Sequence, residues 1–354
     1  MMNPDGYFHR VGRMTPTSLW INNVTPDEAD IALTIGATGC TQNPAYPEKM
    51  LTHPEGKALA YRLLDGILKG EPDDNRAQAR LQCALVQKVA ERFLPLYQSS
   101  HGRLGYVTIQ ADPLHEDLDT ILSAARSHCA ASPNIMAKIP AIPAGFAAMR
   151  ILLGEGRPLL ATEVMSVAQA MDCARLYQEA VEEMENPPVM YLAHIPGIFD
   201  EYIGRVVARD AIDIPADYVW QGGVLVAKKI DALLRGGGYA IGLCSGGARG
   251  LHHFTEMVGA RCSVTINYRG AADKLLELDP PVVEHFHRPA SPDVLDALCE
   301  KIPDFRRAYE KGALAPDEYE QYGPVRLFRS NFVEGWASAN RRIAERRAAL
   351  EGLK

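Results

Sequence analysis

The sequence predicts a (β/α)8 barrel followed by a C-terminal helical extension. Eight short apolar or β-branched runs alternate with longer stretches of helical periodicity, which is typical of parallel βαβ units. A length of 354 residues suits one large α/β barrel or two ordinary domains. The alternative is a doubly wound open sheet, but no G-x-G-x-x-G motif follows a strand. We expect the barrel at 15–290 and the extension at 291–354, packed on the barrel or serving a subunit interface.

The predicted strands are short runs of alternating or continuous apolar residues between turn residues. They lie at 18–23, 39–43, 104–112, 134–139, 158–165, 189–195, 238–244 and 261–267. An insert at 47–102 separates the second strand from the third, and its periodicity predicts two helices, near 56–68 and 75–97. From about Ser291 onward the pattern is helical only.

Composition narrows the classes of function. The net charge is -7 and no stripe of Lys and Arg occurs, which argues against nucleic acid or an anionic membrane as partner. Neither a membrane-spanning run nor a secretory signal is recognisable. The seven cysteines form no C-x-x-C pair, which predicts a cytoplasmic protein without a zinc site. The histidines of "EHFH" (284–287) and the pair His252–His253 lack the spacing of a metal cage, so we expect no metal and no cofactor.

A lysine in an apolar strand is the first candidate for chemistry. Lys138 lies near the end of the fourth predicted strand, in "NIMAKIP", and barrels carry their chemistry at the C-terminal ends of strands. Alternation places Met136 and Lys138 on the inner face. An inward lysine in an apolar wall has a lowered pKa, which gives a nucleophilic free amine. The alternative is a lysine that reaches out of the barrel end or forms a structural ion pair.

Polar residues mark the ends of the other strands. Asn43 ends the second strand in "CTQNP", before a proline turn, Gln110 lies near the end of the third in "IQAD", and Thr162 lies on the fifth. After the seventh strand, "CSGGARG" reads as a glycine-rich turn opening a helix near Arg249. Its backbone N–H groups, a helix N-terminus and the guanidinium would suit a phosphate. Taken alone, this segment is equally compatible with a plain glycine-rich loop.

These segments together resemble the transaldolase family, over roughly Ser18 to Leu276. The most specific match is "NIMAKIPAIPAGFAAMRILLGEG", which resembles the segment that carries the Schiff-base lysine. "SLWINNVTPDEADIALTIGATGCTQNP", "GYVTIQAD", "LLATEVMSVAQAMDCA" and "GYAIGLCSGGARGLHHFTEMVGARCSVTI" resemble other strands and turns of the family. The resemblance implies a transferase that transfers or cleaves a three-carbon ketol unit of a ketose or ketose phosphate. It also implies a role in carbohydrate metabolism such as the pentose phosphate pathway.

The resemblance also implies roles for individual residues. Lys138 would form the Schiff base, and Thr162 would hold a water. Asn43 would contact substrate hydroxyls, whereas Ser245 and Arg249 would bind the far end of the substrate, where a phosphate usually sits. The partner would be a small sugar or sugar phosphate, and such barrels often form homo-oligomers.

Two carboxylates of the family are absent from their usual places. The aspartate that ends the first strand is matched by Asn22, and the glutamate that ends the third is matched by Gln110. An amide can orient a water but cannot take up a proton near neutral pH. Related fructose-6-phosphate aldolases also carry glutamine on the third strand, so Gln110 favours a lyase, while Asn22 fits neither group. A barrel that binds a sugar or metabolite without turnover is the alternative from another class. Glu163 is expected to point away from the barrel axis, toward the helix layer.

The sixth strand leaves two registers open. "EYIGRV" resembles the family segment that ends in a phosphate-binding arginine. It would make Arg205 an anion ligand and Tyr202 a substitute for the missing proton-transfer carboxylates. If the strand itself sets the register, His194 and Ile198 take those places, one anion contact is lost, and "EYIGRV" is an amphipathic surface helix.

Overall fold

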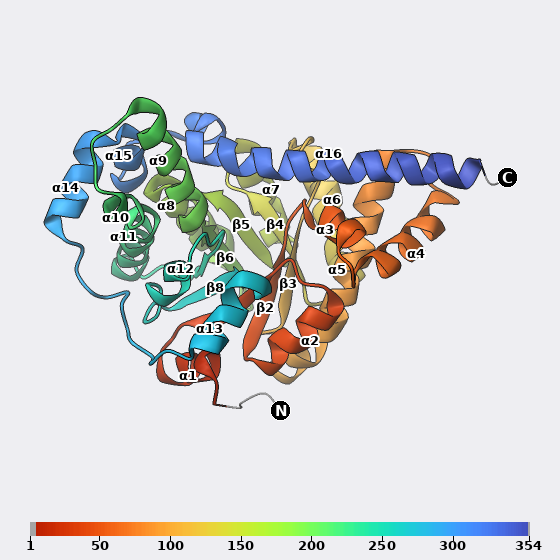
Figure 1. The fold of residues 1–354 in the computed structure, drawn as a ribbon, viewed down its shortest axis with the longest axis horizontal. Helices are drawn as coiled ribbons and strands as arrows, with labels where there is room; N and C mark the ends of the chain where they lie inside the picture. The colour runs from red at the N-terminus through yellow and green to blue at the C-terminus, as the bar shows by residue number, and fades with distance from the viewer. Residues whose placement is uncertain (1–4, 353–354) are drawn as a thin grey trace.

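The computed structural model of the chain describes residues 5–352. Its eight parallel strands close into one barrel in sequence order, as the sequence predicts (Figure 1). The strands are β1(Ser18–Asn22), β2(Ala37–Gln42), β3(Tyr106–Gln110), β4(Ile135–Pro140), β5(Leu159–Val164), β6(Met190–His194), β7(Gly242–Ser245) and β8(Cys262–Asn267). Only β7 differs by several residues from its predicted bounds. It begins at Gly242 rather than Gly238 because Gly238, at φ 66°, turns the chain after the preceding helix.

Helices alternate with these strands and enclose the barrel (Figure 1). They are α1(Tyr7–Met14), α2(Pro26–Thr34), α3(Tyr46–Thr52), α4(Lys57–Leu68), α5(Asp74–Ser99), α6(Leu118–Ala131), α7(Pro143–Gly154), α8(Val167–Val181), α9(Pro196–Asp210), α10(Ala216–Val219), α11(Gly222–Gly236), α12(His252–Thr255), the kinked turn η1(Tyr268–Ala272), α13(Asp273–Leu278), α14(Pro292–Lys301), α15(Pro303–Tyr309), the 3-10 helix η2(Pro316–Gln321) and α16(Gly323–Glu351). The insert after β2 contains the two predicted helices, α4 and α5, together with the short α3.

Two aromatic rings fill the barrel interior on the side away from the C-terminal ends of the strands. Trp20 of β1 and Tyr191 of β6 meet with their ring centroids 5.3 Å apart. Each ring faces a glycine on the adjacent strand, where an added Cβ would lie 2.4 Å from Trp20 at Gly39 and 2.5 Å from Tyr191 at Gly242. Only glycine leaves room for these rings at the two positions, so side chains fill this part of the barrel interior. Polar side chains are left to the C-terminal ends of the strands.

The last helix of the C-terminal extension, α16, lies over those strand ends. It contacts α3, α5, α9 and β5, and Figure 1 shows it as a long dark-blue helix from α9 toward α4. Arginines along its second half anchor it to the insert: Arg342 to Glu48 at 3.0 Å, Arg346 to Asp65 at 2.6 Å and Arg347 to Asp74 at 2.7 Å. The extension therefore helps to shape the barrel mouth, while the division of the chain into domains at residue 290 stays a prediction.

Within residues 5–352, no helix combines the length and the apolar character that crossing a membrane requires.

Candidate active site at the barrel mouth

A cavity of about 150 Å³ opens at the C-terminal ends of the strands. Four residues predicted from the sequence line it: Lys138, Asn22, Asn43 and Arg249. The helix α16 contributes Phe328, Asn331 and Phe332 to the same cavity. None of these three was predicted from the sequence. Two phenylalanines four residues apart indicate one helix face, but such a pair is more often core than site.

The amine of Lys138 is buried and unpaired. Lys138 lies on β4, in register with Gln110 on one side and Leu160 on the other, and it is only 7% exposed. Burial lowers the pKa of its amine to about 8, against the smaller opposing effects of Glu163 and Cys244. Among residues 5–352, the amine makes no hydrogen bond or ion pair. It lies 5.7 Å and 5.3 Å from the ring centroids of two phenylalanines of α16. A useful fraction of free amine is therefore present near neutral pH.

Asn22 is fixed by its neighbours. Its Nδ2 donates to Asn267 Oδ1 at 2.9 Å, and its Oδ1 accepts from Thr41 Oγ1 at 3.0 Å. Asn43 is held in a similar way, because its Oδ1 accepts from the backbone N–H of Ala45 at 3.0 Å. Both amides are thus held in fixed orientations at the cavity lining, and neither can take up a proton.

Gln110 and Thr162 lie beside this cavity rather than on its lining. Both are buried, at 1% and 0% exposure. Thr162 Oγ1 has no hydrogen-bond partner within the described part of the chain. Gln110 Nε2 donates to Glu163 Oε1 at 3.1 Å. Because β4 lies between β3 and β5, this bond crosses the strand that carries Lys138.

The expectation that Glu163 points toward the helix layer is wrong. Glu163 has φ 61°, and the pairing of β5 with β6 shifts register between Ala161 and Val164. A residue in the left-handed region breaks the alternation of side chains, as in a β-bulge. The carboxyl group of Glu163 consequently reaches Gln110, on the same side of the sheet as Lys138. A carboxylate that the sequence analysis assigned to structure therefore lies beside the lysine.

The turn that carries Arg249 differs from its prediction. The helix expected to begin near Arg249 is α12, a single turn that starts at His252, so no helix N-terminus supports an anion here. Instead, His253 Nδ1 accepts the backbone N–H groups of Arg249 at 3.3 Å and of Gly250 at 3.2 Å. Across the ring, His253 Nε2 lies 3.0 Å from Asp200 Oδ2, and Asp200 Oδ1 accepts from the N–H of Gly223 at 2.6 Å.

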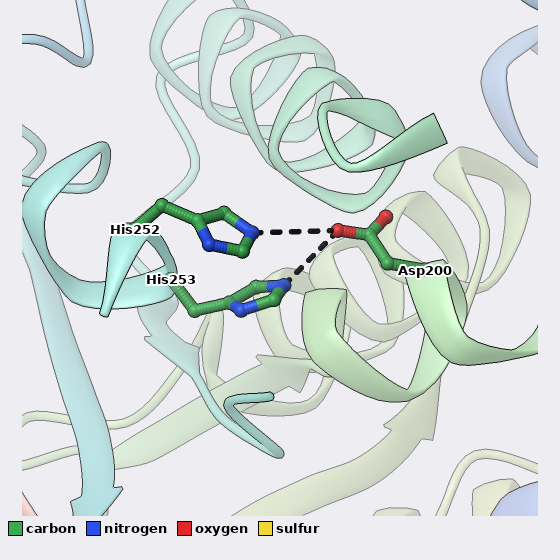
Figure 2. A group of neighbouring side chains, drawn as sticks. All are labelled: Asp200, His252 and His253. Carbon is green, nitrogen blue, oxygen red and sulfur yellow. Dashed lines mark hydrogen bonds and ion pairs between the residues drawn. The ribbon is translucent and has the colours of Figure 1, made fainter. Parts of the chain in front are cut away.

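Asp200, His252 and His253 converge, and one ligand atom of each lies within 4.8 Å of the others (Figure 2). The hydrogen bonds favour a structural role over a metal cage. Two N–H groups point at His253 Nδ1, so the ring proton lies on Nε2 and is donated to Asp200. No lone pair then remains at that nitrogen for a metal. The cluster holds the turn that presents Arg249 to the cavity.

Replacing Asp200 with asparagine is expected to weaken both this turn and anion binding. The new NH2 group would face the N–H of His253, which removes a charge-assisted hydrogen bond worth roughly 1.5–3 kcal/mol. Chemical denaturation should report that loss, and thermal shifts with inorganic phosphate should report weaker binding. The control is Asp210→Asn, since Asp210 pairs with Arg209 on the surface, and we expect a change within about 0.5 kcal/mol. Equal stability and equal phosphate response in both variants would contradict the role of Asp200.

The structure does not place Tyr202 and Arg205 at the cavity. The segment "EYIGRV" lies inside α9, so the strand sets the register and Ile198 lines the cavity. The Tyr202 hydroxyl donates to Asp304 Oδ2 of α15 at 2.5 Å. Arg205 is exposed and pairs with Glu201 one helical turn away. The predicted motif therefore lies on a helix rather than on a strand, and its tyrosine contacts the C-terminal extension.

Glu201 occupies the region where an anion was expected. It accepts from Arg249 Nε at 2.6 Å and also pairs with Arg205, so one carboxylate is shared by two guanidinium groups. A phosphate at Arg249 would compete with this carboxylate. Ser245, at the end of β7, is buried with its Oγ unpartnered among the described residues, and the cavity lining passes instead through Gly246 and Gly247.

Fold and site together define a closed (β/α)8 barrel with a lysine and an arginine in one cavity at its mouth. Comparison with known proteins places the chain more narrowly. It belongs to the Transaldolase/Fructose-6-phosphate aldolase family, whose profile matches residues 19–267.

Individual relatives match at low identity. The chain is 31% identical over 165 residues to the transaldolase of Campylobacter jejuni, covering 44% of this chain and 48% of that protein. It is 26% identical over 174 residues to the transaldolase of Trichodesmium erythraeum, with coverages of 47% and 45%. It is 26% identical over 198 residues to transaldolase 1 of Streptomyces coelicolor, which covers 53% of this chain and 51% of that protein. The chain spans about half the length of the curated relatives it matches.

Proposed function

We propose that this protein is a transaldolase-like enzyme that transfers or cleaves a three-carbon ketol unit of a ketose or ketose phosphate through an imine on Lys138. One observation carries the proposal: a buried, unpaired lysine amine, whose pKa burial lowers to about 8, lines the same cavity as Arg249. Such an amine is a nucleophile for a carbonyl at neutral pH. Membership of the family supports the same assignment.

The proposed reaction runs through an imine and an enamine. The nitrogen lone pair of Lys138 attacks the ketose carbonyl, and the resulting carbinolamine loses water to leave an iminium. The hydroxyl on the fourth carbon then loses its proton, and the bond between the third and fourth carbons breaks. Its electrons flow to the iminium nitrogen, which gives an enamine and a free aldehyde. An aldose captures the enamine in a transfer, a proton captures it in a cleavage, and water then frees the lysine.

The other cavity residues would bind and enclose the substrate. The amides of Asn22 and Asn43 would donate hydrogen bonds to its hydroxyls. Arg249 would bind a phosphate at the far end by exchanging Glu201 for the ligand. Phe328 and Phe332 would keep water from the amine.

Trapping of the imine tests the proposal directly. The protein is incubated with borohydride and a panel of sugar phosphates, free ketoses and sulfosugars, and the adduct is located by peptide mass mapping. We expect reduction to fix one sugar on Lys138. The internal control is Lys49, whose amine is paired with Glu28 at 3.1 Å, and which should stay unmodified.

Other results would redirect the assignment. No adduct with any compound of the panel would count against the enzyme. Stabilisation by a ligand without adduct or turnover would favour the binding barrel. If an adduct forms, release of free aldehyde without an acceptor would favour the lyase over the transferase. The glutamine at position 110 favours the same outcome, because the related fructose-6-phosphate aldolases carry glutamine there.

A further inference from the structure

The proposed reaction needs a group that moves protons, and the amides of Asn22 and Gln110 cannot supply one. We propose that Glu163, held beside Lys138 by Gln110 and balanced by Arg329 of α16, is the acid–base group of this barrel. The inference rests on the proposed imine chemistry and deepens it. It also gives the C-terminal extension a part in the reaction.

The position of Glu163 follows from its backbone and its one hydrogen bond. The left-handed φ turns the side chain inward, and Gln110 fixes Oε1 across the strand that carries Lys138. The carboxyl group is completely buried, and its Oε2 has no hydrogen-bond partner among residues 5–352. A fixed carboxyl with one oxygen committed and the other free can exchange a proton on the free oxygen.

The surroundings of Glu163 raise its pKa, with burial as the largest cause. Burial and, to a smaller extent, the charge of Glu320 raise the pKa of Glu163. The charges of Arg329 and Lys138 and the hydrogen bond from Gln110 lower it. A second buried carboxyl, Glu116, also competes for the same guanidinium.

Arg329 decides which carboxyl carries the proton. It forms direct ion pairs with Glu116 and, at 2.7 Å, with Glu320, whereas it acts on Glu163 only through its charge. Burial raises the pKa of Glu116 to about 8 despite that ion pair, so the two carboxyls compete for one proton. We assign this proton to Glu163, because it has no direct ion pair with Arg329 that would favour its ionised form. Because Gln110 donates to Oε1, the proton lies on Oε2.

This arrangement balances the protons of the proposed reaction. The Glu163 carboxyl gives its proton to the hydroxyl of the carbinolamine, which leaves as water while the iminium forms. The resulting carboxylate, between Arg329 and the iminium, then accepts the proton of the hydroxyl on the fourth carbon as the carbon–carbon bond breaks. It returns that proton to the enamine carbon in a cleavage, or to the alkoxide of the new product in a transfer.

Glu163→Gln replaces the carboxyl group with an amide of the same shape that cannot exchange a proton near neutral pH. With a ketose that modifies wild-type Lys138, we expect borohydride still to trap the imine on prolonged incubation, while turnover at neutral pH falls about 10²- to 10⁴-fold. The wild-type pH–rate profile should fall at high pH as the carboxyl ionises, and this descending limb should vanish in the variant. Failure of the wild type to form any adduct would refute the proposed function rather than this role.

Arg329→Met tests the same idea with Glu163 intact. Loss of the positive charge raises the pKa of the remaining carboxyl pair, so the descending limb should move to higher pH. The companion variant is Glu320→Gln, which removes a negative charge that raises the pKa of Glu163, so there the descending limb should move to lower pH. The inference is overturned if Glu163→Gln keeps the rate and profile of the wild type. An unchanged profile in Arg329→Met overturns it equally, and that variant decides if Glu163→Gln does not fold.

Discussion

Replacing Lys138 with methionine is expected to abolish sugar trapping and to lower turnover by at least about 10³-fold, because the nucleophile is lost. In the wild type, turnover should increase about tenfold for each pH unit below 8, since only the free amine attacks the carbonyl. Above the pKa of the amine this increase should end, and ionisation of Glu163 should then lower the rate. Steady-state rates between pH 5 and 9 would measure both effects.

The same substitution is expected to stabilise the fold at neutral pH. The folded-state pKa of Lys138 lies near 8, below its ordinary value of 10.5. Below pH 8 both states are protonated, and the folded state carries the full cost of a buried charge, on the order of 3 kcal/mol. Between pH 8 and 10.5 the unfolded state binds more protons, so wild-type stability should increase with pH through this window. Lys138→Met should lack this increase and unfold at higher denaturant at pH 7.

Lys49→Met is the matched control. The Lys49 amine is paired with Glu28 outside the cavity, so its loss should leave turnover unchanged and should not stabilise the protein. Equal stability of Lys138→Met and the wild type at pH 7, with no pH dependence in either, would show that the Lys138 amine is not desolvated.

The residues at the strand ends could be predicted because local rules place them. Strand alternation and the parallel βαβ pattern set the inner face of β4, so Lys138, Asn22 and Asn43 lie where the sequence indicates. These rules need only the spacing of apolar residues along one strand. They say nothing about contacts made by segments far away in the chain.

The rest of the site depends on such contacts or on backbone exceptions. Glu163 escaped prediction because its positive φ reverses the alternation, and Glu has no preference for that conformation that a sequence could reveal. Phe328 and Phe332 reach the cavity from a helix almost 200 residues after Lys138. Tyr202 was predicted at the site from a short motif alone, but this motif lies on α9 and not on a strand.

Replacing Phe332 with alanine is expected to raise the pKa of Lys138 and to destabilise the protein. Phe332 is 2% exposed, and removing a buried phenyl ring costs about 3–5 kcal/mol. Water entering beside the amine would reverse part of the desolvation that lowers its pKa from 10.5 to about 8. Less free amine would remain at pH 7, so imine trapping there should slow by about 10-fold or more, and recover as pH increases.

Phe332→Leu separates water exclusion from the electrostatics of the ring. Leucine keeps the wall apolar but removes the ring face that lies 5.3 Å from the ammonium, a contact worth about 0.5–2 kcal/mol to the charged form. The pKa of Lys138 should therefore fall in Phe332→Leu and rise in Phe332→Ala, as measured from the pH dependence of trapping rates. Shifts of the same sign in both variants would mean that α16 does not control the solvation of the amine. Opposite shifts would establish that the C-terminal helix sets the reactivity of a lysine on β4.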